Sequence, residues 1–272
     1  MTQVLAIHRE PIYAPGREVE DARILELTAA ALEDQGVAVK AASVEEARSG
    51  GDEAPVILAM CQGPDGLALL DRYVAEGRLV INSPAAIRNC YRERLVPLLL
   101  AADLAFPESH VIQVEGAISE IARGALAGHW WVKRGDVHAT GPGDVVRATR
   151  ASLQHQFSQF RSRGIQRVVL QRHVPGHEVK FYAVQGQGLV DWRWAGEEPG
   201  PDFAPAALQA LVEAGARCLG VEVYGGDVIA TDSGALWLVD VNDWPSFRTC
   251  QEAGAQAIAT HVLARARQEG RL

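Results

Sequence analysis

The first 82 residues alternate short apolar runs with amphipathic stretches, and this alternation constrains the fold more than any other feature of the chain. The runs that predict strands are Val4–Ile7, Val37–Val39, Val56–Met60 and Leu79–Asn82. Apolar residues recur at helical spacing over Glu18–Gln35, and a further helix is predicted over Gly66–Glu76. Strands that alternate with helices form a parallel sheet with helices on its faces, so we expect a small α/β domain here.

The loop after the first strand, Arg9–Glu20, carries Pro, Gly and several charged side chains, among them Arg9 and Arg17. It lies beyond the carboxyl end of a strand, which is where ligands bind in open parallel sheets. Loops of this length are often functional, although a solvated connector would have a similar composition.

Near the other end of the chain, two leucine-rich or β-branched runs flank the turn-forming segment Thr231-Asp232-Ser233-Gly234, which predicts a β-hairpin. Asp240 and Asn242 are two residues apart and therefore share a strand face, and pairing can bring Asp227 beside them. Oxygen ligands of this kind suit Mg²⁺. Surface hairpins with acidic residues are common, but Asp and Asn are depleted in strand interiors, which favours the metal-binding interpretation.

The centre of the chain combines helices, strands and a glycine-bearing loop. Ser83-Pro84 predicts the start of a helix over Ala85–Ala101, and a short helix is expected over Ile118–Ala127. The strand Trp130–Lys133 delivers a lysine into the loop Arg134–Asp144, a common way to hold phosphates. The loop matches neither GxxxxGK[ST] nor GxGxxG, and a hairpin turn with an exposed lysine would explain this segment alone.

The second half of the chain reads as antiparallel strands followed by helices. The remaining predicted elements are a strand at Val111–Val114, a polar helix at Leu153–Arg163, strands at Arg167–Val174, Glu178–Val184 and Gly188–Trp194, and helices at Phe203–Leu219 and Gly254–Gln268. Glu178 and Lys180 share a strand face, which a structural ion pair explains most simply.

Composition narrows the class of protein. The chain has 272 residues, 48% of them hydrophobic and 22% charged, as in soluble globular proteins. It has neither a run of about 18 apolar residues nor a signal-peptide pattern, so we expect a cytoplasmic protein without a membrane span. The net charge of −8 argues against non-specific nucleic-acid binding. The four cysteines form no CxxC pair, which predicts neither a disulfide framework nor a zinc site.

Taken in order, from about Val4 to Ala264, these motifs resemble those of the ATP-grasp superfamily. Asn82-Ser83-Pro84-Ala85-Ala86-Ile87 is similar to the family's entry to its central helix, and Trp131-Val132-Lys133 to the strand whose lysine binds the α and β phosphates. The chain most resembles the ribosomal-protein-glutamate-ligase-like branch, with some likeness to inositol trisphosphate 5/6-kinases. The resemblance implies an α/β and α+β chain in which a pre-ATP-grasp α/β domain (1–83) precedes an ATP-grasp domain (84–272). The latter would comprise a central or lid subdomain (84–170) and a C-terminal catalytic subdomain (171–272).

The resemblance also implies roles for individual residues. Asp227, Asp240 and Asn242 match the magnesium triad and would hold two Mg²⁺ ions, with Mn²⁺ as an alternative metal. The implied nucleotide contacts are Arg94, Lys133, His138, Gln171, His173, Val174, Glu178 and Lys180. The implied catalytic residues are Lys133, Lys180 and Arg248.

Four arginines are candidates for gripping a substrate carboxylate, namely Arg9, Arg17, Arg193 and Arg248. Surface charge is the alternative for each. Arg248 is best placed because it follows the metal strand, and we expect the segment Ser246-Phe247-Arg248 to face substrate.

The chain departs from the family pattern at several positions. Arg92-Glu93-Arg94 stands where the family often has a lysine; Arg94 is assigned the phosphate role, with Arg92 as the alternative. Asp240 stands where a glutamate is usual, and its shorter side chain would bridge two ions differently. Arg172 stands where an acid is frequent, and the loop lacks the usual dense glycine run.

The implied reaction joins a small-molecule carboxylate to an amine or similar nucleophile through an acylphosphate, with ATP converted to ADP and phosphate. The loop Gly135–Gly143 would cover the intermediate, and no side-chain nucleophile is required, so the cysteines are expected in the core. A small-molecule kinase would use the same ATP site, and a non-catalytic nucleotide-binding protein is the least supported alternative. Partners would be these small molecules, with neither nucleic acid nor membrane, and a homodimer is compatible with the sequence.

Overall fold

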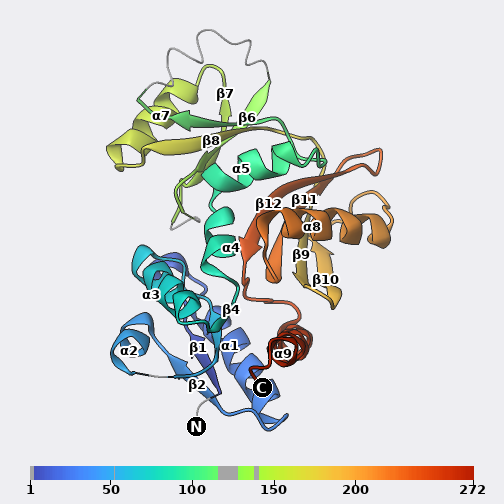
Figure 1. The fold of residues 1–272 in the computed structure, drawn as a ribbon. Helices are drawn as coiled ribbons and strands as arrows, with labels where there is room; N and C mark the ends of the chain where they lie inside the picture. The colour runs from blue at the N-terminus through green and yellow to red at the C-terminus, as the bar shows by residue number, and fades with distance from the viewer. Residues whose placement is uncertain (1–2, 52, 116–127, 138–140) are drawn as a thin grey trace.

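The computed structural model describes residues 3–51, 53–115, 128–137 and 141–272. The helix expected over Ile118–Ala127 lies outside the described residues. The rest of the chain forms three four-stranded sheets with helices packed on them (Figure 1). Among the described residues, no helix combines the length and the apolar composition needed to cross a bilayer.

The first sheet is parallel, as predicted, and has the strand order β2-β1-β3-β4. Its elements are β1 (Val4–Ile7), β2 (Val39–Ala42), β3 (Val56–Ala59) and β4 (Leu79–Ile81), with the helices α1 (Glu18–Glu33), α2 (Val44–Ser49) and α3 (Pro64–Ala75). Helix α2 was not predicted, because it is only six residues long. The sequence nevertheless marks where this helix starts, because Ser43 and Glu46 have the spacing of a capping box and form one in the structure.

The second sheet is antiparallel, with the order β5-β8-β6-β7. Its elements are β5 (Ser109–Gln113), β6 (His129–Arg134), β7 (Val145–Thr149) and β8 (Arg167–Arg172), and the helix α7 (Leu153–Ser162) packs against it. Its core includes the fully buried Trp130 and Phe160. Strand β7 was not predicted because its sequence, VVRAT, is short and half polar.

The third sheet is also antiparallel and has the order β10-β9-β11-β12. Its strands are β9 (His177–Val184), β10 (Gly188–Trp194), β11 (Val223–Ala230) and β12 (Leu236–Asp243), with α8 (Pro205–Leu219) packed on it. Strands β11 and β12 form the predicted hairpin. A Cβ atom on Gly226 would lie 2.1 Å from the carbonyl oxygen of Asp240, so only glycine allows the two strands to approach this closely.

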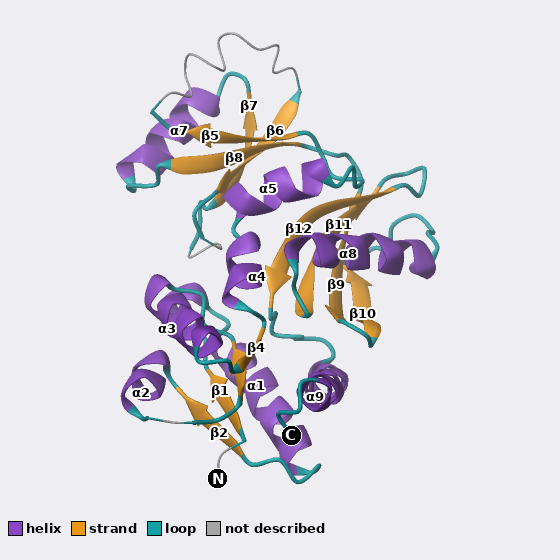
Figure 2. Cartoon of the chain, in the orientation of Figure 1, coloured by secondary structure: helices purple, strands orange, loops and turns teal. Residues whose placement is uncertain are grey.

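The single helix expected over Ala85–Ala101 is two helices, α4 (Pro84–Asn89) and α5 (Arg92–Ala101). Figure 2 shows them as separate segments between the first sheet and the other two. Tyr91, at the junction, has an extended backbone and donates its hydroxyl hydrogen to the carbonyl of Gln62. This tertiary contact turns the chain, and local sequence patterns do not report it.

The C-terminal helix α9 (Gln251–Gln268) packs against α1, which lies near the N-terminus of the chain (Figure 1). Together the two helices cover one face of the first sheet, where Ile258 and Val262 join Ile24 and Leu25 in one core. The other face is covered by α2 and α3. The division of the chain at residues 83 and 170 stays a prediction.

Asn82 joins the first sheet to the third. Its side chain is fully buried, donates to the carbonyl of Val223 at 2.7 Å and accepts from the backbone amides of Glu222 (2.8 Å) and Val223 (2.9 Å). One side chain therefore satisfies three buried or half-buried backbone groups at the start of β11.

We expect Asn82→Ala to lower the free energy of unfolding by about 3 kcal/mol, because it removes the acceptor of the Glu222 and Val223 amides and one of the two donors to the Val223 carbonyl, which keeps the amide of Trp244 at 2.9 Å. Urea denaturation monitored by circular dichroism measures the loss. Asn89→Ala is the matched control, since Asn89 donates one bond, to Leu219 at 3.0 Å, and its removal should cost about 1 kcal/mol. Equal losses in the two variants would contradict a joining role for Asn82.

Candidate functional site

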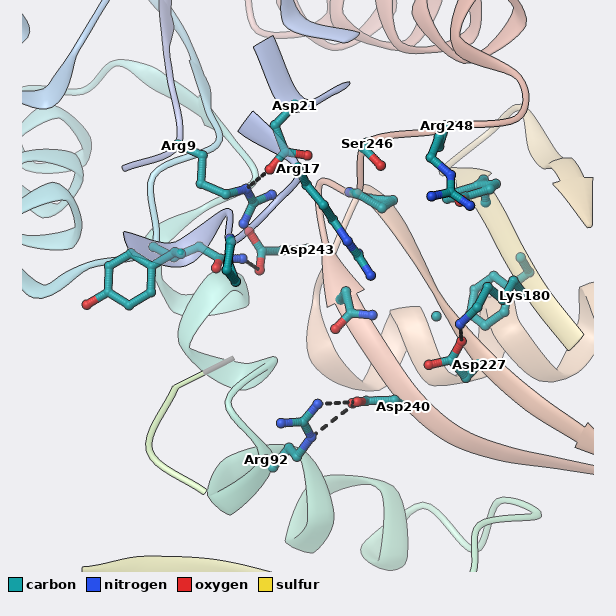
Figure 3. Close-up of a pocket in the computed structure, with 18 of the residues that line it drawn as sticks. Arg9, Arg17, Asp21, Arg92, Lys180, Asp227, Asp240, Asp243, Ser246 and Arg248 are labelled. Carbon is teal, nitrogen blue, oxygen red and sulfur yellow. Dashed lines mark hydrogen bonds and ion pairs between the residues drawn. The ribbon is translucent and has the colours of Figure 1, made fainter. Parts of the chain in front are cut away.

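A cavity of about 440 Å³ lies where the first sheet, the third sheet and α5 meet (Figure 3). Seven residues predicted for metal or substrate binding line it, together with Lys180, which was predicted to be catalytic and to contact the nucleotide; the seven are Arg9, Arg17, Arg193, Asp227, Asp240, Asn242 and Arg248. Residues far apart in the sequence therefore meet in one place. Gly141 and Pro142 of the predicted phosphate-covering loop also line the cavity.

The floor of the cavity is a row of charged residues that crosses the whole third sheet. In the strand register Arg193 of β10 pairs with Lys180 of β9, Lys180 pairs with Asp227 of β11, and Asp227 pairs with Asp240 of β12. Directly opposite residues on paired strands share a face, so all four side chains point to the same side. Asn242 lies two residues along from Asp240 on this face, as predicted.

Two cations hold the two aspartates of this row. Lys180 Nζ lies 2.8 Å from Asp227 Oδ1 and 2.8 Å from Glu178 Oε1. Arg92, the first residue of α5, donates from Nε (3.1 Å) and Nη2 (2.6 Å) to Asp240 Oδ2. Burial lowers the pKa of Lys180, but the charges and hydrogen bonds of Asp227 and Glu178 outweigh it and raise that pKa above its usual value.

The predicted phosphate lysine approaches the site from the second sheet. Lys133 of β6 is buried and donates to the carbonyl of Val239 at 3.2 Å, one residue before Asp240. Gln171 of β8 donates to the same carbonyl at 3.4 Å. Burial lowers the pKa of Lys133, Arg92 lowers it further, and the negative charge of Asp240 opposes both.

The other predicted nucleotide residues are spread more widely. His173 accepts a hydrogen bond from Trp131 Nε1 at 3.2 Å, and burial lowers its pKa. Arg94 is exposed and does not line the cavity, whereas Arg92 is buried and does. Of the two arginines left open by the sequence, Arg92 is therefore the one that lies at the cavity, and the phosphate role stays a prediction for either. His138 lies outside the described residues.

The four candidate arginines differ in their partners. The side chain of Arg9 is only 7% exposed and has two partners, with Nε 2.9 Å from Asp21 Oδ2 and Nη2 2.5 Å from the carbonyl oxygen of Trp244. Within the described part of the chain, Arg17, Arg193 and Arg248 form no ion pair, and Nε of Arg193 is buried without a hydrogen-bond partner. In Figure 3, Arg17 and Arg248 extend into the cavity from different segments.

Several lining residues were missed from the sequence. Asp21, Gln62 and Asp243 line the cavity, and Gln62 Nε2 donates to Asp243 Oδ1 at 2.7 Å. Asp243 directly follows Asn242 and so falls outside the two-residue spacing of Asp240 and Asn242, which is why spacing alone did not single it out. The expectation for Ser246-Phe247-Arg248 was wrong for Phe247, which is fully buried in the core, while Ser246 and Arg248 line the cavity.

The donor set fits a hard divalent cation but is small. It offers two carboxylates and one amide, which suit Mg²⁺ when phosphate oxygens complete the coordination. In the described residues, no group of three or more acidic, histidine or cysteine side chains is arranged as metal ligands. All four cysteines are free; Cys61 and Cys90 are buried, as expected, and burial raises the pKa of both thiols.

No protein-family model matches the chain, and no curated protein matches it in sequence. Its structure is similar to a RimK domain protein ATP-grasp from Sphaerobacter thermophilus (TM-score 0.69, 23% identity, 96% of this chain and 99% of the other). It is also similar to D-alanine–D-alanine ligase from Bacillus anthracis complexed with ATP (0.74, 10%, 100% and 99%). A third similar structure is the ATP-grasp ligase PsnB complexed with minimal precursor, Mg and ADP (0.66, 15%, 98% and 99%).

The different partners of Arg9 and Arg17 lead to a test of which arginine is structural. Arg9→Ala strands the buried Asp21 carboxylate and should cost roughly 3–5 kcal/mol of unfolding free energy. Arg17→Ala, the matched control, should change it by less than about 0.5 kcal/mol. Urea denaturation at neutral pH measures both.

The Arg9→Ala cost should also depend on pH. Burial raises the pKa of Asp21, while Arg9 opposes that rise. Without Arg9 the folded-state pKa rises further above the unfolded value, so the penalty is full above the folded pKa and disappears as the pH falls below the unfolded one. A loss that is the same at pH 7 and in mild acid would contradict the buried-carboxylate explanation.

Proposed function

We propose that this chain, which has the ATP-grasp fold, is an ATP- and Mg²⁺-dependent ligase that joins a small-molecule carboxylate to an amine or similar nucleophile, with release of ADP and phosphate. One observation carries the proposal: Asp227 and Asp240 face the same cavity as three arginines that form no ion pair with the described residues. Ligases complexed with ATP, or with Mg and ADP, are among the proteins of similar structure, which supports it.

The acidic side of the cavity would receive the nucleotide phosphates. Asp227, Asp240 and Asn242 would hold Mg²⁺, which neutralises charge on the transferring phosphoryl group. Lys180 is only about one-third exposed and already carries two carboxylate contacts, so it can exchange one of them for a phosphate oxygen. Lys133 would bind phosphates from the second sheet, where its Nζ lies 3.2 Å from the carbonyl oxygen of Val239 in β12.

The part of the cavity lined by Arg17, Arg193 and Arg248 would hold the substrate. A guanidinium matches a carboxylate with two parallel hydrogen bonds, and Arg17, Arg193 and Arg248 keep that capacity because no partner in the described chain uses it. Lys180 stands between Arg193 and Asp227 in the row, so it adjoins both the substrate side and the phosphate side. We propose that it orients the carboxylate toward the γ-phosphate.

The proposed reaction has two steps. A carboxylate oxygen attacks the γ-phosphorus, the bond to the β-γ bridging oxygen breaks, and ADP leaves. The amine then attacks the acyl carbon, loses a proton, and phosphate leaves with the pair of electrons from the broken C–O bond. The protein supplies position and charge at each step and no nucleophile of its own, in keeping with the four free cysteines outside the cavity.

ATP with Mg²⁺ should raise the melting temperature of the protein. At about 100 times the dissociation constant, binding contributes roughly 2.7 kcal/mol, which is about 5–10 °C for a chain of this size. Asp227→Asn should lose most of the shift because an amide replaces an anionic ligand. Asp232→Asn, in the exposed turn of the same hairpin, should keep it. No shift in the parent protein would refute the nucleotide site.

Hydroxylamine should reveal the intermediate. Incubation with ATP, Mg²⁺ and pools of carboxylates should yield a hydroxamate by mass spectrometry, because hydroxylamine intercepts an acylphosphate. Asp227→Asn is the negative control. A stable phosphorylated alcohol from a pool of hydroxyl compounds, without any hydroxamate, would instead identify a small-molecule kinase.

A further inference from the structure

We infer that Arg92 takes the place of one divalent cation, so that the nucleotide binds in this site with one metal ion rather than two. The inference rests on the proposed function, because it presupposes a nucleotide held by Mg²⁺ beside Asp227 and Asp240. It concerns how the charge of Asp240 is neutralised.

The contact between Arg92 and Asp240 has the features of a permanent pair. Two guanidinium nitrogens donate to the same oxygen, Oδ2, at 3.1 and 2.6 Å, and the side chains are only 8% and 7% exposed (Figure 3). Arg92 cannot lose its charge in a protein. Separating the two groups would leave a buried guanidinium without its counter-charge, which is strongly unfavourable.

This geometry limits what Asp240 can bind. A carboxylate that bridges two metal ions offers both of its oxygens, or shares one oxygen between two cations. Oδ2 already accepts two hydrogen bonds from a cation, so a divalent ion on the same oxygen would lie beside the guanidinium and be repelled by it. Asp240 can therefore serve one ion but cannot bridge two.

The neighbouring aspartate is held differently. Asp227 is paired with Lys180, and both side chains are more exposed, at 27% and 35%. Lys180 has a second carboxylate partner in Glu178, also at 2.8 Å, so it can release Asp227 without becoming an unpaired charge. The single ion would consequently be held closer to Asp227 than to Asp240.

The fold fixes Arg92 in this position. The turn at Tyr91 ends α4 and starts α5 at Arg92, and the next residue, Glu93, donates its amide to the carbonyl of Gly135 at 3.0 Å. A continuous helix over Ala85–Ala101 would present its side chains in a different direction. The break between α4 and α5 thus places a fixed positive charge opposite β12.

Counting bound Mn²⁺ tests the inference without measuring turnover. Mn²⁺ bound in the presence of the non-hydrolysable analogue AMPPNP would be counted by equilibrium dialysis and electron paramagnetic resonance. We expect one nucleotide-dependent ion per chain in the parent protein and two in Arg92→Ala or in the closer-sized Arg92→Gln. Arg92→Lys should retain one ion because it keeps the charge.

Arg88→Ala is the matched control. Arg88 also makes a two-nitrogen contact with an aspartate, Asp71, but at the surface and away from the cavity, so the ion count should stay at one. Two ions in the parent protein, or one ion in both neutral variants, would overturn the inference and leave the ligase proposal intact. No nucleotide-dependent ion in the parent protein would refute the proposed function and this inference with it. If neither neutral variant folds, the count in the parent protein still decides.

Discussion

The acidic pair at the centre of the third sheet is the constraint on which the rest of the site depends. Asp227 and Asp240 are directly opposite on adjacent strands, an arrangement that like-charge repulsion disfavours. It persists because Lys180 reaches one carboxylate along the same row and Arg92 reaches the other from α5. The sheet therefore needs a helix from another part of the chain to stabilise its own register. The second sheet also contacts β12, because Lys133 donates to the carbonyl of Val239.

The cavity also requires that the first and third sheets keep a fixed position relative to one another. Asn82 binds the start of β11, and Arg9 binds the carbonyl of Trp244 just after β12, so both strands of the hairpin are attached to the first sheet. Arg9 thus acts mainly as a support for the site, whereas Arg17 remains available at its edge. Two arginines from one loop differ in their contacts because only one of them forms an ion pair with a buried aspartate.

Much of this architecture was predicted from the sequence, and the features that were not predicted have physical causes. Regular alternation of apolar runs predicted the parallel sheet, and the spacing of Asp240 and Asn242 predicted the face of the hairpin that carries the acids. The break at Tyr91 was missed because it depends on a contact with Gln62, which is distant in sequence. Arg92 was left as an alternative to Arg94 for the same reason: two residues apart on a helix, they point in different directions, and only packing decides which is buried.

The packing of α9 on the first sheet has a consequence for how the chain folds during synthesis. One face of this sheet is covered partly by α1 and partly by residues that lie more than 200 positions downstream, among them Ile258 and Val262. An emerging N-terminal segment would expose the part of that face that α1 leaves uncovered until residues beyond 250 leave the ribosome. Long-range contacts of this kind slow folding. The nascent chain would therefore depend on chaperones for longer than a chain whose first sheet is completed by its own helices.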